Sequence, residues 1–227
     1  MKLAIIVPAY NEAATIAEVV ARLRAVALDK EIVVVDDGST DGTWEALQPL
    51  AGPGLRVLRH ERNRGKGAAV RTALEAVTAG AVVIQDADLE YQPEELPALL
   101  APVAAGRADV VYGSRFRGTI EGMRFSNYLA NKLLAWTASI LFGARITDEA
   151  TCYKLFRTSV LKAIPLTSER FEICPEVTAR VRRRGIRIHE LPITYRGRTV
   201  AMGKKIRLAD AWEAFHTLIR FRLARAA

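Results

Sequence analysis

The feature that most restricts the fold of this chain is a regular alternation of two kinds of segment in its first half. Short apolar runs rich in Val, Ile and Leu predict strands, and they cover residues 3–7, 31–35, 55–58, 81–84 and 109–112. Longer amphipathic segments between them predict helices over residues 12–26, 43–50, 67–79 and 93–105. Strands that alternate with helices build a mostly parallel sheet covered on both faces. We therefore expect an α/β fold.

The starts of the predicted helices carry residues that favour helix initiation. Asn11 is expected to cap the first helix, and Asp41 or Ser39 the second. Pro93, which is followed by two glutamates, fits the first turn of the fourth helix.

The second half of the chain is less regular. We expect a loop over 118–122, a long apolar helix over 125–142 and a strand over 153–156. Beyond these the pattern predicts, in order, a helix over 174–184, a strand over 187–193 ending at Pro192, a mobile segment over 197–205 and a basic helix over 208–222. The chain has 227 residues, the length of one large domain, so we expect a single domain over 1–227.

Polar clusters follow the predicted strands of the first half. They cover residues 8–12, 36–41, 86–90 and 113–117. In a parallel sheet these positions lie beyond the carboxyl ends of the strands, where such folds bind their ligands. We expect the functional site at this edge.

Three carboxylates alternate after the fourth strand, at Asp86, Asp88 and Glu90. On an extended chain, side chains two positions apart point to the same side, so Asp86 and Asp88 can face one point. Oxygen ligands in this arrangement suit Mg²⁺ or Mn²⁺. Two alternatives are a general acid and base pair, which a single strand end serves poorly, and an acidic turn that only caps the next helix.

Two further clusters predict anion and nucleoside contacts. Asp36 and Asp37 end the second strand, where an acidic residue can accept hydrogen bonds from a ribose or a base, although the run is also typical of a capping turn. Lys66 stands at a helix start between two glycines, which favours a bound anion. Arg115 and Arg124 follow the fifth strand and can bind phosphate, or they are solvated surface residues.

Composition excludes several classes of protein. The net charge is +8, and residues 179–227 hold 13 Lys and Arg against 3 Asp and Glu, which indicates an anionic partner or a solvated face. Cys152 and Cys174 have no zinc-site or disulfide-scaffold spacing, and the three histidines share no ligand spacing. The apolar N-terminal run is too short for a signal peptide and no apolar stretch is long enough to span a bilayer, so we expect a cytoplasmic protein.

Seven motifs in order along nearly the whole chain resemble family 2 glycosyltransferases, above all the dolichol-phosphate and polyprenyl-phosphate mannose and glucose synthases. The motifs are PAYNE at 8–12, VDDGSTDGT at 35–43, NRGKGAA at 63–69, QDADLEY at 85–91, VVYGSRF at 110–116, TDEATCYKLF at 147–156 and ELPITYRGR at 190–198. The resemblance implies a GT-A fold, with a Rossmann-like nucleotide-sugar-binding half over 1–117 and an acceptor-binding half over 118–227 that carries the basic C-terminal helix. It also implies a nucleotide-sugar donor and a divalent metal, Mg²⁺ or Mn²⁺.

The resemblance assigns donor and metal contacts to matching positions. The expected nucleotide-sugar contacts are Pro8, Tyr10, Glu12, Asp36, Asp37, Lys66, Asp86, Ala87 and Asp88. The expected metal ligands are Asp86, Asp88 and Glu90, the last where relatives often have glutamine. Glu90 is thus either a third ligand or a departure that tunes the donor.

Acceptor and loop contacts follow in the same way. Arg115, Arg124 and Asn131 match the segment that receives the lipid phosphate, and Arg198, Lys204 and Lys205 match a basic loop that closes over the donor diphosphate. Asp88, Arg115 and Arg198 are the expected catalytic residues.

The predicted reaction is the inverting transfer of a hexose, from a donor of the GDP-mannose or UDP-glucose type, to a polyprenyl or dolichyl phosphate. A phosphate acceptor is already anionic and needs arginines rather than a general base. The alternative is a hydroxyl acceptor in polysaccharide, glycolipid or antibiotic assembly, with Asp148 or Glu149 as the base. A nucleic-acid-binding module is a third interpretation, but it leaves the Asp86 and Asp88 pair unexplained.

Two segments fit contact with a membrane. The helices expected over 125–142 and 208–222 combine large apolar residues with arginine, which is typical of helices that lie on an anionic bilayer. Packing on the protein's own core is the competing interpretation for each. We expect peripheral association with the cytoplasmic face of the membrane.

Overall fold

The computed structural model describes residues 1–198 and 208–223, with side chains in the last segment described from Trp212 onward. A single seven-stranded sheet runs through the molecule in the order β3-β2-β1-β4-β6-β5-β7. The strands are β1 Leu3–Ala9, β2 Lys30–Asp36, β3 Leu55–Arg59, β4 Ala81–Ile84, β5 Val110–Glu121, β6 Lys154–Arg157 and β7 Ile188–Arg196. Among them only β6 runs antiparallel to its neighbours β4 and β5.

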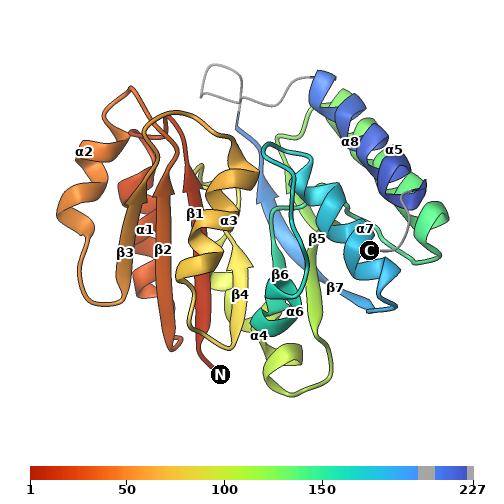
Figure 1. The fold of residues 1–227 in the computed structure, drawn as a ribbon, viewed down its shortest axis with the longest axis horizontal. Coiled ribbons are helices and arrows are strands. Elements are labelled where there is room, and N and C mark those ends of the chain that lie inside the picture. The colour runs from red at the N-terminus through yellow and green to blue at the C-terminus, as the bar shows by residue number, and fades with distance from the viewer. Residues whose placement is uncertain (199–207, 224–227) are drawn as a thin grey trace.

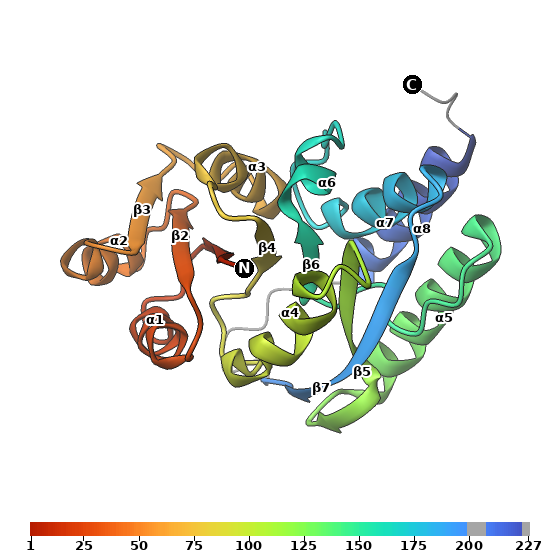
Figure 2. The same ribbon diagram turned by 90° about the horizontal axis from the view of Figure 1, so that it is seen from below.

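Helices cover both faces of this sheet (Figures 1 and 2). They are α1 Ile16–Ala25, α2 Thr43–Leu47, α3 Lys66–Ala76, α4 Leu96–Ala104, α5 Phe125–Phe142, α6 Thr158–Lys162, α7 Ile173–Arg183 and α8 Leu208–Leu223, with short 3₁₀ turns η1 Gln48–Leu50 and η2 Pro93–Glu95. Seen from below, α1 and α4 lie on one face of the sheet, and α3, α6 and α7 lie on the other (Figure 2). The expected α/β fold with a mostly parallel sheet is confirmed.

The central strands are apolar along their whole length because both faces are covered. Every residue of β4 is buried, and so are Leu3 to Val7 of β1. β1 lies between β2 and β4 in parallel register, with Ile5 opposite both Ile32 and Val83. This buried centre fixes the positions of the loops that follow β1, β2 and β4.

The predicted loop at 118–122 is wrong, because β5 continues to Glu121 beside β7. Gly118 makes this possible: a Cβ atom there would stand 2.1 Å from the carbonyl oxygen of Ile193. Gly118, which is typical of a turn, therefore allows β5 and β7 to approach each other closely. β7 likewise runs past Pro192 to Arg196, which an edge strand of a sheet tolerates.

Asn11 does not cap the first helix, which begins at Ile16 after Thr15. Asn11 has a left-handed backbone with φ of 50°. Its backbone N–H donates to Ser39 Oγ, and its side-chain Oδ1 accepts from the backbone N–H of Thr40. Asp41 does accept a hydrogen bond from the backbone N–H of Thr43, the first residue of α2. Pro8 and Ala9 therefore end β1, and Tyr10, Asn11 and Glu12 form a loop and not a helix start.

A second, smaller apolar cluster lies outside the main core. α5 and α8 pack against each other and against α7, as Figure 1 shows at the right of the molecule. The buried members of this cluster are Leu134, Ala138, Phe142, Ile146, Ala179, Leu218 and Phe221. None of the helices in the described part of the chain has the length and apolar content that a bilayer span requires.

Candidate active site

The loops that follow β1, β2 and β4 meet at one edge of the sheet. Glu12 donates its backbone N–H to Thr43 Oγ1 at 2.8 Å, which joins the β1 loop to the start of α2. Thr15 Oγ1 donates to the carbonyl oxygen of Ala87 at 2.7 Å, which joins the same loop to the Asp86–Asp88 segment. Thr15 has no motif signal in the sequence, so this tie was not predicted.

Pro8, Tyr10 and Ala87 take the positions expected for donor contacts. Pro8 is half-buried near the end of β1, and Tyr10 follows the strand with its side chain half-buried. Ala87 is buried between the two aspartates. Their contact with a nucleotide stays a prediction.

Asp37 is bound to the protein itself in this structure. Its Oδ1 lies 2.6 Å from His60 Nδ1 and accepts a hydrogen bond from Arg64 N–H, and its Oδ2 accepts one from Gly65 N–H. Asp36 is fully buried, 3.2 Å from Arg59 Nε. The Asp37 carboxylate therefore holds the loop that leads into α3, and the buried His60 completes this cluster.

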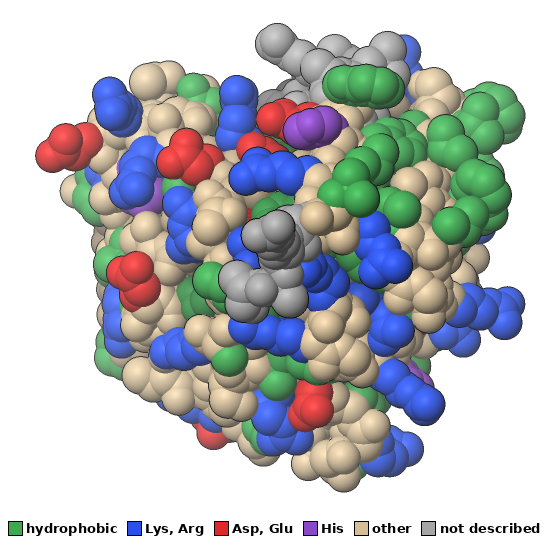
Figure 3. Space-filling model, turned by 45° about the vertical axis from the view of Figure 1, so that its right-hand side comes forward, with side chains coloured by type: hydrophobic (Ala, Val, Ile, Leu, Met, Phe, Trp, Pro, Cys, Tyr) green, Lys and Arg blue, Asp and Glu red, His purple; other side chains and the backbone are tan. Residues whose placement is uncertain are grey.

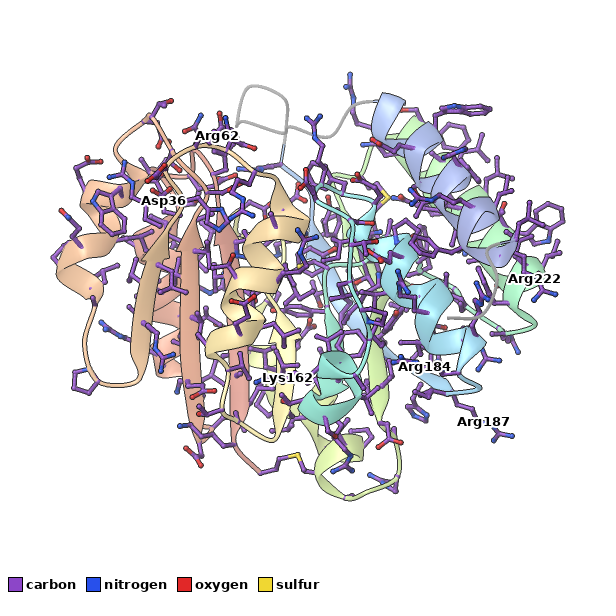
Figure 4. The ribbon with its side chains drawn as sticks, in the orientation of Figure 1. Asp36, Arg62, Lys162, Arg184, Arg187 and Arg222 are labelled. Carbon is purple, nitrogen blue, oxygen red and sulfur yellow. The ribbon has the colours of Figure 1, made fainter. Side chains whose placement is uncertain are left out.

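The loop that Asp37 holds lines an open basic pocket of about 610 Å³. Its lining residues are Arg62, Asn63, Arg64, Gly65, Glu169 and Arg170. Asp36 and Arg62, labelled in Figure 4, lie at the same end of the molecule. The pocket thus opens at the carboxyl edge of the sheet, where ligands were expected.

Lys66 is the first residue of α3, where a positive charge is unfavourable to the helix dipole, and its contact with Asp86 accounts for it. Its ammonium lies 2.6 Å from Asp86 Oδ1, so the anion that offsets the helix dipole is a side chain of the protein. Burial works to lower the pKa of Lys66, but Asp86 more than offsets this and holds that pKa well above its ordinary value. Burial likewise works to raise the pKa of Asp86, and Lys66 lowers it overall. Both groups are charged at neutral pH.

Asp88 faces a second cation. Arg198 lies just beyond β7, and its Nη2 is 3.3 Å from Asp88 Oδ2. The same guanidinium donates two hydrogen bonds of 2.8 Å to the carboxylate of Glu12. Burial, with the charges of Asp86 and Glu90, raises the pKa of Asp88 to about 7. A buried carboxylate beside other carboxylates is a site that gains from a bound cation.

The donor set fits a divalent cation held by two carboxylates. Asp86 and Asp88 bring carboxylate oxygens to one loop. Each already lies beside a cation of the protein, Asp86 beside Lys66 and Asp88 beside Arg198. Mg²⁺ and Mn²⁺ commonly take one or two carboxylates and complete their coordination with substrate phosphates. Within residues 1–198 and 212–223, however, no cluster of three acidic, His or Cys side chains has metal-binding geometry.

Strand alternation does not bring Glu90 onto one face with Asp86 and Asp88 in this structure, and its role as a third ligand stays a prediction. The reason lies in Leu89, whose φ of 61° is left-handed. Alternation requires an extended chain, and a left-handed residue ends it. Glu90 turns toward β7, where its Oε2 accepts a hydrogen bond from Tyr195 and its Oε1 accepts one from the backbone N–H of Arg198.

Arg115 is bound to a carboxylate of the protein in this structure, and its contact with an acceptor phosphate stays a prediction. The side chain is buried and makes two hydrogen bonds of 2.7 Å to the carboxylate of Asp148. Its guanidinium also lies 5.1 Å from the centre of the Tyr195 ring. Arg124 is exposed at the start of α5 and Asn131 is half-buried within that helix. The predicted acceptor trio is thus spread over a buried and an exposed region.

The remaining predicted residues are divided between described and undescribed parts of the chain. Lys204 and Lys205 lie outside the described residues. The basic excess of the C-terminal fifth is not gathered at the site: Arg184 and Arg187 lie near the end of the molecule opposite Asp36 and Arg62 (Figure 4). Tyr195 also lies at the site and was not predicted. Its place there follows from the hydrogen bond that it donates to Glu90, a contact between segments far apart in the sequence.

Comparison with known proteins gives concordant results. The family model for Glycosyl transferase family 2 matches residues 4–164. The undecaprenyl-phosphate mannosyltransferase of Micrococcus luteus is 34% identical to this chain over 90% of its length and 87% of that protein's. The dolichol-phosphate mannosyltransferase of Pyrococcus furiosus is 29% identical over 91% of this chain, which spans 61% of that protein.

The fold is shared with a solved enzyme. The glucosyl-3-phosphoglycerate synthase of Mycobacterium tuberculosis, in complex with Mn²⁺, uridine diphosphate and phosphoglyceric acid, superposes with a TM-score of 0.75 at 23% identity. The match covers 100% of this chain and 80% of that one. The expected GT-A fold is confirmed.

Proposed function

The chain belongs to glycosyl transferase family 2, and from that premise we propose that it transfers a hexose, with inversion, from a nucleotide sugar to a polyprenyl phosphate. Relatives named for undecaprenyl-phosphate and dolichol-phosphate support the acceptor class. A third relative, from Methanococcus voltae, is named for transfer of N-acetylglucosamine to dolichyl phosphate. The acceptor class is thus shared while the sugar varies, and we propose a donor of the GDP-mannose or UDP-glucose type.

The observation that carries the choice of acceptor is the pairing of Asp148 with Arg115. A hydroxyl acceptor needs a base that can reach its proton. Asp148 has no exposed surface and both of its oxygens accept from Arg115. Glu149 also has no exposed surface. Neither predicted base faces the site, and a phosphate acceptor requires none.

The donor end of the reaction uses the loop after β4. Asp86 and Asp88 would hold Mg²⁺ or Mn²⁺, which neutralises a diphosphate and makes it a better leaving group. Lys66 and Arg198 stand beside these carboxylates and supply two further cations at the place where the leaving group gains charge. The lipid phosphate would attack the anomeric carbon from the opposite side, as inversion demands.

An exposed apolar surface supports a lipid acceptor. Figure 3 shows hydrophobic side chains gathered at the upper right of the molecule, on the side formed by α5 and α8. We define the α5–α8 surface by its large exposed side chains: Phe125, Tyr128, Leu129, Leu133, Trp136, Ile140, Trp212, Ile219 and Leu223. Trp136 is 63% exposed and Trp212 77%. Contiguous apolar patches of this kind mark sites of protein or membrane contact.

Charge favours a membrane as the occupant of the α5–α8 surface. Arg124, Arg220 and Arg222 are exposed on the same two helices, so the apolar surface has a basic border. Apolar residues with basic neighbours are typical of helices that lie on anionic lipid. The interpretation that these helices pack on the protein's own core is right for Leu218 and Phe221, which pack inward on α5 and α7. Trp212 and Ile219 face out, and their contact with a membrane stays a proposal.

The decisive experiment supplies the purified protein with Mn²⁺ or Mg²⁺, a set of sugar nucleotides and a polyprenyl phosphate in detergent. We expect one sugar to be transferred to the lipid, with a requirement for the divalent cation. A matched reaction with the dephosphorylated polyprenol should give no product. Transfer to the polyprenol, or release of nucleotide without a glycolipid, would contradict the phosphate acceptor.

A further inference from the structure

Glu90 is joined to the end of β7 by three hydrogen bonds. Its carbonyl oxygen accepts from the backbone N–H of Arg196 at 2.9 Å. Its carboxylate accepts from Tyr195 Oη at 2.7 Å and from the backbone N–H of Arg198 at 2.8 Å. Glu90 is 7% exposed, so these bonds are largely shielded from water. One residue thus fastens the loop of the two aspartates to the segment that carries Arg198.

The side chain of Arg198 depends on this attachment. Its backbone is held by Glu90, and its guanidinium then spans from Glu12 in the β1 loop to Asp88 in the β4 loop. The side chain is only 10% exposed. The two-point bond to Glu12 fixes the orientation of the guanidinium, so its contact with Asp88 requires the Arg198 backbone to be held at the matching place.

Tyr195 extends the attachment into the core. Its ring packs against Tyr91 at a centroid distance of 5.6 Å and against the buried Arg115 guanidinium. The Tyr195 backbone also bridges to Tyr91, the residue after Glu90. The hydroxyl that holds Glu90 is therefore itself held by rigid neighbours.

We propose that Glu90 is a positioning residue that places Arg198 beside Asp88 and the donor diphosphate, and that it is not a ligand of the metal. The inference rests on the proposed function for its effect on turnover, but not for its effect on structure. Leu89 supplies the cause: its left-handed backbone ends the alternation of side chains, and the carboxylate of Glu90 is bound to Tyr195 and to the backbone of Arg198. Glu90 acts through Arg198 and does not touch substrate.

Two substitutions separate the hydrogen bonds of Glu90 from its charge. Glu90→Gln keeps both attachments, because a glutamine oxygen can accept from Arg198 N–H and its amide can donate to Tyr195 Oη. Glu90→Ala removes both. Tyr195→Phe removes one bond from the partner side and leaves Glu90 intact, which provides a second variant should Glu90→Ala fold poorly.

The first measurement needs no substrate. Hydrogen exchange of the metal-free protein should show a protected amide at Arg198 in the wild type, protection retained in Glu90→Gln, and exchange faster by about tenfold or more in Glu90→Ala. Mn²⁺ binding, followed by electron paramagnetic resonance, provides the comparison with a true ligand. We expect Glu90→Ala to weaken Mn²⁺ binding by far less than Asp88→Ala does, and Tyr195→Phe to leave it unchanged.

The second measurement is turnover with the donor that the proposed reaction identifies. A misplaced Arg198 should lower kcat/KM by about 10- to 100-fold in Glu90→Ala, since loss of alignment near the reacting centre has effects of this size. Glu90→Gln should restore most of it. Tyr195→Phe should act in the same direction, and its effect should be absent once Glu90 is alanine, because the two residues share one bond.

Opposite results would overturn the inference. Equal losses of Mn²⁺ affinity in Glu90→Ala and Asp88→Ala would make Glu90 a metal ligand. Unchanged exchange at Arg198 in Glu90→Ala would remove the positioning role, whatever the turnover. If the wild-type protein transfers no sugar to any lipid phosphate, the proposed function fails, while the exchange and Mn²⁺ experiments still decide the role of Glu90.

Discussion

Arg115 and Asp148 form a two-point ion pair beneath the candidate active site, with Nε and Nη2 of the arginine each 2.7 Å from a carboxylate oxygen. The backbone N–H of Arg115 donates to the same carboxylate at 2.9 Å. Asp148 is fully buried and Arg115 is 5% exposed. Burial works to lower the pKa of Arg115, and Asp148 more than offsets this, so the pKa of the guanidinium is well above its ordinary value. The pair therefore has a structural role.

Asp148→Asn should destabilise the fold, because it leaves the Arg115 charge buried without a partner. The expected loss is about 3–5 kcal/mol of unfolding free energy. Urea denaturation measures it, and Asp109→Asn is the matched control, since Asp109 pairs with Arg157 at the exposed surface and should cost less than about 1 kcal/mol. A stable Asp148→Asn protein that has lost only turnover would instead support Asp148 as a base for a hydroxyl acceptor.

Asp86→Asn and Asp88→Asn should each weaken Mn²⁺ binding and lower metal-dependent turnover by at least about 100-fold, because under the proposed function each removes a charged ligand of the cation. Titration of Mn²⁺ against sugar transfer measures both effects. Asp29→Asn is the control, as Asp29 is exposed and precedes β2 at the opposite edge of the sheet. Removal of metal by a chelator should abolish transfer in the wild type and be reversed by added Mn²⁺. Full activity in the chelator would exclude a metal-dependent reaction.

The fold and the general location of this site could be predicted from the sequence, because hydrophobic periodicity and strand-end polarity are local signals. The strand after which Asp86 and Asp88 follow, and the helix over 125–142, are examples. Contacts between distant segments could not be predicted. The left-handed φ of Leu89 has no signal in the sequence, and Gly118 is typical of a turn until its neighbour Ile193 is known.

Partner choice was the other limit of sequence reasoning. An arginine after a strand is equally compatible with a bound phosphate and with a buried carboxylate, and Arg115 has the carboxylate. The same holds for Asp37, whose hydrogen bonds go to His60 and the loop before α3. Residue type predicts the chemistry that a side chain prefers, whereas the partner is fixed by residues far along the chain.

Lys66→Met should strengthen the binding of Mn²⁺ to the donor-free protein. Lys66 occupies Asp86 at 2.6 Å, so a cation that enters must compete with the ammonium. We expect a gain of about tenfold in Mn²⁺ affinity, since close charges in a partly buried site interact by several kcal/mol and water recovers part of this. Turnover should fall, because a cation beside the diphosphate is lost. Weaker Mn²⁺ binding in Lys66→Met would show that Lys66 organises the metal site instead.

Glu176 should make the stability of the fold depend on pH in the acid range. This buried carboxylate accepts hydrogen bonds from Thr167, Ser168 and Arg180, and it holds the loop that packs on Gly65 and Gly67. Burial works to raise its pKa, but these hydrogen bonds lower it below the ordinary value of 4.5. A lowered folded pKa contributes stability that is complete above the unfolded pKa and is lost as pH falls through the folded one.

Urea denaturation between neutral pH and pH 3 tests this contribution. Glu176→Gln should be less stable than the wild type at pH 7, and the difference should shrink as the pH falls through the folded pKa of Glu176 and the wild-type carboxylate takes up a proton. Glu75→Gln, at an exposed position of α3, is the control and should match the wild type throughout. A constant difference between Glu176→Gln and the wild type at all pH values would mean that shape, not charge, matters at this position.

Trp136→Ser and Trp212→Ser should each reduce binding to anionic vesicles by on the order of tenfold, because each removes a large apolar side chain from the α5–α8 surface. Co-sedimentation with vesicles of phosphatidylcholine, with and without phosphatidylglycerol, measures the affinity. Trp44→Ser is the matched control. Trp44, the remaining tryptophan of the chain, lies on α2 under Arg59 and away from this surface. Salt should weaken binding as well, through Arg220 and Arg222. If the wild type instead forms a dimer without lipid and both substitutions give monomers, the α5–α8 surface is an interface between two copies and not a membrane contact.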